Sequence, residues 1–211
     1  MNASKFLRYA LFCLAAVVAF SACNKDEEEP DPVQPTTTPL CFTAEEDSSY
    51  VKLYRSSKQI EFPDLEYSRD GNNWEPFTLD SNDTRYLKEV SLPLAGDKIY
   101  VRNRGKATSF TTAPERRIQF FFKGGVSASG NVMSLIDKDC NTLEVPCDYA
   151  FYGLFADNPR LFSAPELPAT TLAPRCYGYM FLNCSMLRKG PSALPAQVMK
   201  SHCYEGMFMN C

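Results

Sequence analysis

The segment Cys176–Cys184, with the sequence CYGYMFLNC, decides the fold because it returns 27 residues later as Cys203–Cys211, CYEGMFMNC. An earlier copy, Ala150–Asn158 (AFYGLFADN), lies 26 residues upstream of the middle one. The turn Leu167–Ala169 likewise aligns with Leu194–Ala196. A fixed period in the twenties is typical of a solenoid, and leucine-rich repeats occupy this range.

Equivalent positions of the copies hold equivalent side chains. One slot carries phenylalanine, at Phe155, Phe181 and Phe208. A second carries a small residue, at Ala150, Cys176 and Cys203, and a third carries a turn residue, at Asn158, Cys184 and Cys211. Stacking sets each residue against its counterpart in the next coil, so the pattern predicts continuous ladders. Cys176 and Cys184 either form a disulfide or remain buried thiols, which behave as small hydrophobes, and we favour the thiols.

The run Met-Phe-x-Asn-Cys-Ser-x-Leu, followed by Leu-Pro-Ala, resembles the BspA-like leucine-rich repeats of bacterial surface proteins. The places of that unit are filled here by Phe181, Cys184, Leu187, Leu194 and Pro195. The resemblance covers residues 130–211 and implies adhesion to host matrix, other bacteria or glycans. The first copy departs from the unit at Asn158, and we expect it to be the entry coil. The third copy stops at Cys211, so we expect the repeats to be incomplete at the C-terminus.

Residues 1–22 have the order of a secretory signal, with Lys5 and Arg8, an apolar run and small residues before Cys23. A cysteine at this place resembles a bacterial lipobox, which implies that Cys23 carries lipid and begins the mature chain. The alternative is an ordinary cleaved signal with an incidental cysteine. The apolar run is shorter than the about 20 residues that a membrane-spanning helix needs.

Residues 23–40 read as a tether, because acidic residues, prolines and threonines cannot bury a core. Proline stiffens such a spacer, which reaches about 50 Å when extended. The run Lys25–Glu29 resembles the acidic export signal of Bacteroidetes surface lipoproteins, and this implies a lipid-anchored protein of the outer membrane that faces outward. The alternative is a solvated linker that carries no export signal.

Residues 41–126 show short β-rich runs broken by turns, which is typical of a β-sandwich domain. These runs are Tyr50–Tyr54, Ile60–Phe62, Leu65–Ser68, Trp74–Leu79, Glu89–Leu94, Lys98–Arg102 and Ile118–Phe122. Asp70-Gly71 favours a tight hairpin turn, in which both central residues have positive φ. Trp74 then stacks across the hairpin or, alternatively, against a sugar. The predicted fold class is therefore mostly β, with this domain followed by leucine-rich repeats over residues 127–211.

Composition excludes several functions. The net charge of −3 becomes −5 without the signal, and the tether holds most of that, so we expect no nucleic-acid partner. The paired cysteines are eight residues apart rather than two to four, so we expect no zinc site, and no motif indicates a cofactor. His202 beside Cys203 is the one conceivable nucleophile pair, but neighbours on a coil point apart. We therefore expect no enzymatic activity and no catalytic residue.

The expected function is binding at the cell surface, with the membrane reached through the lipid anchor and a macromolecule or glycan as ligand. Exposed residues of the repeat strands are the candidate ligand-binding face, and we name Arg160, Ser163, Arg188 and Lys189. Glycan capture by the sandwich through Trp74 is the alternative. Seven cysteines remain after Cys13 and Cys23 are set aside, an odd number that cannot all pair within one chain.

Overall fold

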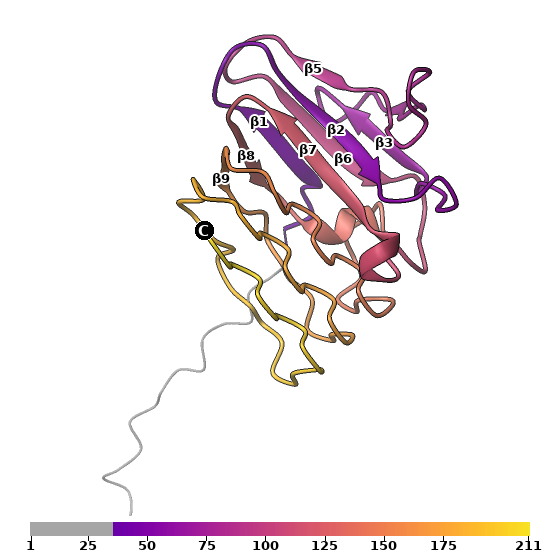
Figure 1. Cartoon of the computed structure of the whole chain (residues 1–211), viewed down its shortest axis with the longest axis vertical. Coiled ribbons are helices and arrows are strands. Elements are labelled where there is room, and N and C mark those ends of the chain that lie inside the picture. Colours follow the sequence, from indigo (N-terminus) through magenta and orange to yellow (C-terminus); the bar gives the residue numbers. More distant parts are fainter. Residues whose placement is uncertain (1–35) are drawn as a thin grey trace, which may run out of the picture. The chain divides into compact units, whose positions relative to one another are not determined.

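Short strands dominate residues 36–211, the part of the chain that the computed structural model describes (Figure 1). They are β1 (Leu40–Ala44), β2 (Ser49–Arg55), β3 (Leu65–Ser68), β4 (Glu75–Pro76), β5 (Val90–Leu92), β6 (Lys98–Asn103), β7 (Ile118–Lys123), β8 (Val126–Ser129) and β9 (Leu161–Ser163). Two short 3-10 helices, η1 (Pro114–Arg116) and η2 (Val132–Leu135), complete this part. The described chain is mostly β, as predicted.

Several predictions fall outside the described residues, namely the signal peptide of residues 1–22, lipidated Cys23 and most of the tether of residues 23–40. The end of the predicted tether is inside the described part: Leu40 is buried in β1, and Pro39 forms a bridge with Asn131. Across residues 36–211, no helix has the length and apolar character needed to cross a membrane.

Every predicted strand run except Ile60–Phe62 contains an observed strand. That run forms a loop instead, with Ile60 buried and the Phe62 ring 4.8 Å from the Arg55 guanidinium carbon. Three strands lie outside the predicted runs, namely β1, β8 and the repeat strand β9. β1 follows directly on the proline-rich segment, and β8 consists of small residues, so neither stands out by hydrophobic pattern.

The strands form two sheets. One has the order β4-β3-β6-β1-β8-β9 and the other the order β5-β2-β7. All pairs are antiparallel except β8 with β9, which run parallel. Residues along β2 alternate between buried and half-buried, which is the period of two expected of a strand with one face on the core.

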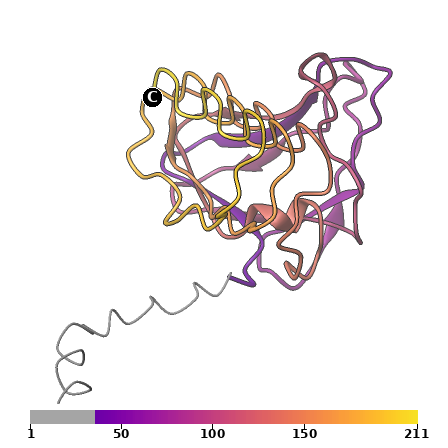
Figure 2. The ribbon, with the colours of Figure 1, turned by 90° about the horizontal axis from the view of Figure 1, so that it is seen from below.

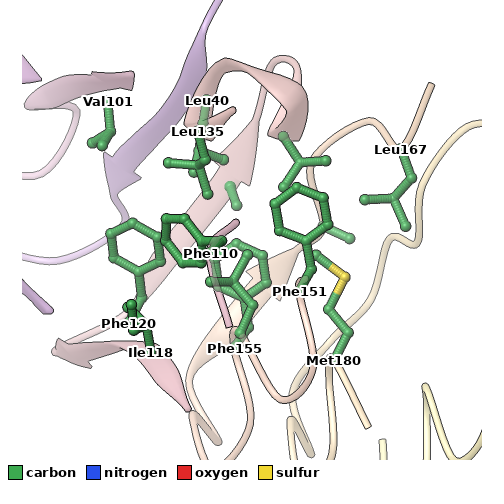
Figure 3. Close-up of a cluster of buried hydrophobic side chains, with 14 of the residues drawn as sticks. Leu40, Val101, Phe110, Ile118, Phe120, Leu135, Phe151, Phe155, Leu167 and Met180 are labelled. Atoms are coloured by element: carbon green, nitrogen blue, oxygen red, sulfur yellow. The ribbon is translucent and has the colours of Figure 1, made fainter. Parts of the chain in front are cut away.

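Aromatic rings join the two sheets to each other and to the repeats. The Phe42 ring of β1 lies 4.9 Å from Phe120 and 5.1 Å from Phe122, both on β7, and 6.1 Å from Phe155 of the repeats. Figure 3 shows Phe120, Phe155 and the neighbouring apolar side chains in this cluster. Tilted aromatic pairs of this kind contribute about 0.5–1.5 kcal/mol beyond their burial.

The repeats continue the larger sheet. β8 pairs with β1 on one side and with β9, a repeat strand, on the other. The predicted boundary between residues 41–126 and 127–211 thus falls at the start of β8, and both halves contribute to a single hydrophobic cluster. Residues 35–211 form one compact unit.

Residues 149–158, 175–184 and 202–211 form the first, second and third coils, which stack in sequence order (Figure 2). Every second N–H of one coil donates to a carbonyl of the next: Phe155 N donates to Met180 O at 2.9 Å, and Phe181 N to Met207 O at 2.9 Å. β7 precedes the first coil, since Phe120 N donates to Leu154 O at 2.9 Å. The stack therefore begins in the smaller sheet.

The predicted phenylalanine ladder is confirmed. Phe155 and Phe181 have ring centroids 5.5 Å apart and interplanar angles of 12°, and Phe181 and Phe208 are 5.4 Å apart at 3°. Phe120 of β7 extends this ladder, 5.8 Å from Phe155. A second ladder runs through Phe151, Tyr177 and Tyr204 with spacings of 5.6 and 5.7 Å.

The side chains of the turn slot satisfy backbone groups. Asn158 Nδ2 donates to Phe120 O at 2.8 Å, and its Oδ1 accepts from Phe122 N at 3.0 Å. In the next coils, Cys184 Sγ donates to Phe155 O at 3.2 Å and Cys211 Sγ to Phe181 O at 3.0 Å. Each side chain in this slot therefore ties its coil to a phenylalanine carbonyl of the preceding layer.

Candidate functional site

Trp74 lies over β6 rather than across its own hairpin. The Arg102 guanidinium carbon is 3.7 Å from the Trp74 ring centroid, a close cation–π contact. Arg102 Nε also lies 2.7 Å from Glu66 Oε1, and Glu66 stands opposite Arg102 in the β3–β6 register. One face of the indole is therefore covered by a guanidinium that Glu66 holds in place, and Trp74 remains half-buried.

The turn before Trp74 differs from the tight turn predicted. β3 and β4 pair as a hairpin, but Gly71 has a φ of 79° while Asp70 is not in the left-handed region. Asp70 Oδ1 instead accepts hydrogen bonds from the backbone N–H groups of Asn72 and Asn73, both at 2.8 Å. These donors hold the pKa of the Asp70 carboxyl far below its usual range. A side chain therefore closes a longer turn.

The four residues proposed for the ligand-binding face lie on β9 and on the chain beside it. Arg160 precedes β9 and pairs with Glu46, and the Arg188 guanidinium carbon lies 5.1 Å from the Phe162 ring centroid. Lys189 forms a parallel bridge with Ser163. Ser163 itself donates to Ala128 O at 2.7 Å, so its hydroxyl is used inside the sheet. Of these three exposed cations, only Arg188 is in contact with the half-buried Phe162 ring, while Arg160 is paired with Glu46 and Lys189 lies beside Ser163.

A groove of ≈390 Å³ was not predicted. It lies between the β3–β4 hairpin and the segment that leads into β5, and groups of both charges line it together with an aromatic ring: Arg69, Lys88, Glu75, Glu89 and Tyr67. The Tyr67 hydroxyl donates to Glu75 Oε2 at 2.9 Å, and Arg69 Nη2 donates to Ser91 O at 2.8 Å. Its volume is within the range of small-molecule sites. Three separate segments build it, so no single motif signals it.

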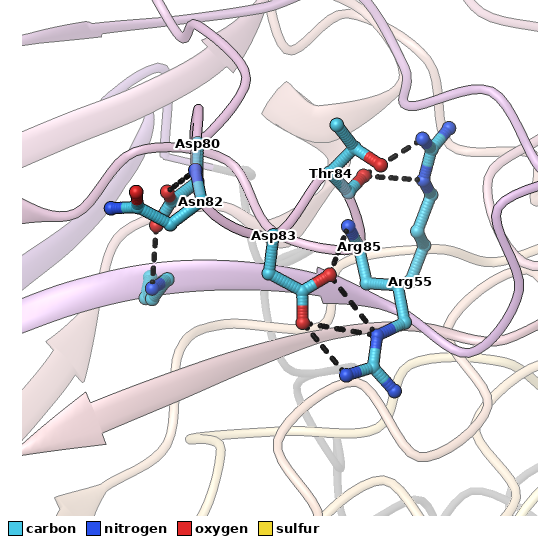
Figure 4. Close-up of polar contacts among 7 residues, drawn as sticks. Arg55, Asp80, Asn82, Asp83, Thr84 and Arg85 are labelled. Carbon is cyan, nitrogen blue, oxygen red and sulfur yellow. Dashed lines mark hydrogen bonds and ion pairs between the residues drawn. The ribbon is translucent and has the colours of Figure 1, made fainter.

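A second groove of ≈370 Å³, more apolar, lies beside Phe77 and Leu79. Arg55 lines this groove, and its Nε and Nη2 donate to Thr84 O at 3.1 and 2.8 Å (Figure 4). Asp83 holds Arg85 in the same loop, at 2.7 Å between Oδ2 and Nη2. These contacts of Arg55 and Arg85 therefore hold the loop of residues 80–86, which connects Leu79 to Leu87 beside the groove.

The thiols of the described residues are free rather than paired: Cys41, Cys140, Cys147, Cys176, Cys184, Cys203 and Cys211. Burial raises the pKa of Cys176 to about 12 and that of Cys184 to about 12. A thiolate is the reactive form, so both are poor nucleophiles at neutral pH.

His202 and Cys203 do not form a nucleophile pair. His202 Nδ1 contacts Ser201 Oγ at 2.6 Å, while Cys203 Sγ faces Met199 Sδ at 3.8 Å. Within residues 36–211, no group of three or more His, Cys, Asp or Glu side chains is arranged to hold a metal ion.

No protein-family model, curated protein or solved structure matches this chain. Its function is therefore argued from its own residues.

Proposed function

We propose that this chain is a lipid-anchored binding protein of the bacterial cell surface, without enzymatic activity. In this proposal a β-sandwich and a leucine-rich-repeat solenoid of the BspA-like kind form one rigid body at the end of the tether. The stacked phenylalanine ladder carries the proposal, since a continuous ladder makes a stiff scaffold that holds exposed side chains at fixed spacing. Extended surfaces of this type suit macromolecular ligands.

The ligand face in this proposal is the cluster of Arg160, Phe162, Arg188 and Lys189. Arg188 already stacks on Phe162, and both Arg188 and Lys189 are exposed. Cations beside an aromatic ring favour a ligand that carries carboxylates or sulfates, either on a glycan or on a protein of the host or another bacterium. Arg160 is engaged by Glu46, so Arg188 and Lys189 are the residues on which binding should depend most.

The double variant Arg188→Glu and Lys189→Glu tests this face. We expect it to lose binding to sulfated glycans and acidic matrix proteins in a surface-binding assay with residues 24–211. Lys58→Glu, an exposed position in a different loop, is the matched control and should bind like the wild type. Equal binding by the wild type, the double variant and the Lys58→Glu control would contradict the proposed ligand face.

Lipid anchoring is tested separately. We expect the wild-type protein to incorporate radiolabelled palmitate and to be cleaved by protease added to intact cells. Cys23→Ser should abolish the label and release the protein from the membrane fraction. A Cys23→Ser protein that stays in the membrane fraction would contradict the anchor without bearing on the ligand face.

Glycan capture by the proposed sandwich is a second candidate, favoured by the ≈390 Å³ groove that Tyr67 and Arg69 line. Pockets for sugars combine an aromatic wall with polar groups, and this groove has both. We expect Tyr67→Ala to lower binding on a glycan array if the groove holds the sugar, and Trp74→Ala to lower it if the indole outside the groove does. Arg188→Glu then serves as the control that leaves array binding unchanged, whereas the opposite pattern favours the repeat face.

A further inference from the structure

A small cavity of ≈160 Å³ lies beside η2, away from the residues proposed above for ligand binding. Asp137 lines it, two positions after the end of η2. The backbone fixes this residue firmly, because Asp137 N donates to Met133 O at 2.8 Å and Lys138 N donates to Gly105 O at 3.0 Å. The carboxylate of Asp137 is therefore held at the cavity by hydrogen bonds on both sides of it.

The Asp137 carboxylate is buried and only half satisfied. Its side chain is 1% exposed. Oδ1 accepts from Asp139 N at 3.2 Å, while no group within residues 36–211 donates a hydrogen bond to Oδ2. The nearest cation, Lys106 Nζ, is 3.5 Å from Oδ2, outside the about 2.7–2.9 Å typical of a charge-assisted hydrogen bond. A buried charge without such a partner is unfavourable.

The Lys106 ammonium is held only weakly at the Asp137 carboxylate. Its side chain is 77% exposed, so the ammonium group is largely hydrated and easily moved. Burial, together with the charges of Asp137 and Asp139, raises the pKa of the nearby Cys140 thiol to about 11, although the charge of Arg102 opposes this. A second acidic residue, Glu144, lines the same cavity. The site is therefore built for a cation.

The chemistry of the walls selects the kind of cation. Among the described residues no group of three or more His, Cys, Asp or Glu side chains is arranged to hold a metal ion, so a bare divalent metal ion would lack ligands at this cavity. Ala107, Ile136 and Pro146 supply an apolar wall next to the two carboxylates. A ≈160 Å³ space is smaller than the about 300–1,000 Å³ of sites for drug-sized ligands, so it suits a small group with a short alkyl chain.

We propose that this cavity binds a primary alkylammonium group, with the ammonium between Asp137 and Glu144 and the alkyl chain against Ala107, Ile136 and Pro146. An ammonium with four carbons has the required size, and this is the end of a lysine side chain. The ligand displaces the Lys106 ammonium, which occupies the same carboxylate in its absence. This inference does not rest on the lipid anchor or on the Arg188 face.

The test is a titration of residues 24–211 with n-butylammonium, followed by NMR at the amides of Ala107 and Lys138. We expect saturable shifts at both amides, and tighter binding by Lys106→Met because the internal competitor is gone. Asp137→Asn and Glu144→Gln should each weaken binding about tenfold, the loss expected for one charge-assisted hydrogen bond. Glu144 is exposed, so Glu144→Gln tests the site even if Asp137→Asn perturbs folding.

Tetramethylammonium, which has the charge but no N–H donor, is the matched control ligand and should produce no saturable shift. Nα-acetyl-lysine methylamide and 1,5-diaminopentane distinguish a lysine side chain of a protein from a free amine as the source. The proposal is overturned if n-butylammonium shifts neither amide in the wild type and in Lys106→Met. It is overturned equally if tetramethylammonium shifts them as much, or if Glu144→Gln and a folded Asp137→Asn both bind unchanged.

Discussion

Tyr177 places a phenol group inside the second aromatic ladder without a hydrogen-bond partner. Its side chain is fully buried, and its hydroxyl oxygen has no partner among the described residues. The equivalent residue of the first coil, Phe151, shows that the slot accepts a ring without the hydroxyl, and the two rings stack at 5.6 Å. The hydroxyl of Tyr177 therefore destabilises the folded state.

Tyr177→Phe should raise the free energy of unfolding by about 1–3 kcal/mol, because a buried hydroxyl without a partner loses its hydration and gains nothing. Urea unfolding of the two proteins measures the difference. Tyr204→Phe, on the half-buried ring of the next coil, is the control and should change stability little. A less stable Tyr177→Phe protein would show that the hydroxyl has a partner after all.

The buried thiols give the stability a dependence on pH. The pKa of Cys176 is raised from 9.0 to about 12 by burial, so the unfolded state ionises first as the pH rises. The contribution of this thiol is fully present below pH 9.0 and is lost between pH 9.0 and about 12. The loss is about 1.4 kcal/mol for each pH unit within that window.

We expect Cys176→Ala to unfold with a shallower pH dependence than the wild type in that window, measured by urea unfolding at several pH values. Alanine suits the slot because Ala150 holds it in the first coil. Identical slopes for the two proteins would mean that the thiol ionises as easily in the folded state as in the unfolded one.

At the scale of the elements, Gly130 follows β8 and lies against Pro39, in the segment before β1. Its φ is 72°, and a Cβ placed on it would lie 2.1 Å from Pro39 O, a backbone atom. The approach is close because Asn131 N donates to Thr38 O at 2.9 Å and Glu166 N donates to Gly130 O at 2.8 Å. One glycine therefore lets the start of the described chain and the repeats meet at the same point.

Gly130→Ala should destabilise the protein by about 2–5 kcal/mol, the sum of a left-handed residue with a side chain and an overpacked contact. Thermal unfolding measures the loss. Gly190→Ala is the matched control, since a Cβ there meets nothing within 4 Å, and its stability should be near that of the wild type. Equal stability of both variants would show that the segment before β1 is free to move away.

At the scale of the whole molecule, the sheets and the coils unfold as one if they share one core. Phe42 and Phe120 contact each other across the sheets, and Phe120 also stacks on Phe155 of the first coil. We expect a single unfolding transition, with the far-ultraviolet circular dichroism and the fluorescence of Trp74 changing together. Two separate transitions would indicate that the halves are independent domains.

The repeats could be predicted from the sequence because their signal is local. Phe155, Phe181 and Phe208 recur at a fixed spacing, and stacking follows from the period alone. The strand runs of residues 41–126 were found for the same reason, since alternation within a few residues marks a buried face. The contact between Lys106 and Asp137 could not be predicted from the sequence, because the two residues lie 31 positions apart and meet only through a β-bridge between two loops.

The sequence by itself determined the β class of the chain, the period of the coils and the roles of the phenylalanine and turn slots, because each depends on neighbours along the chain or on a fixed repeat. Only the tertiary structure decided that β7 underlies the coils, that β8 and β9 pair, and that Trp74 rests on Arg102. It also decided the left-handed backbone of the coils, which recurs at residues of different kinds: Tyr149, Gly153 and Asp157; Arg175, Tyr179 and Asn183; His202, Gly206 and Asn210. Glycine signals such a conformation locally, and asparagine and aspartate favour it to a lesser degree, whereas at Tyr149, Arg175 and Tyr179 hydrogen bonds between coils offset a strain of about 1–2 kcal/mol each.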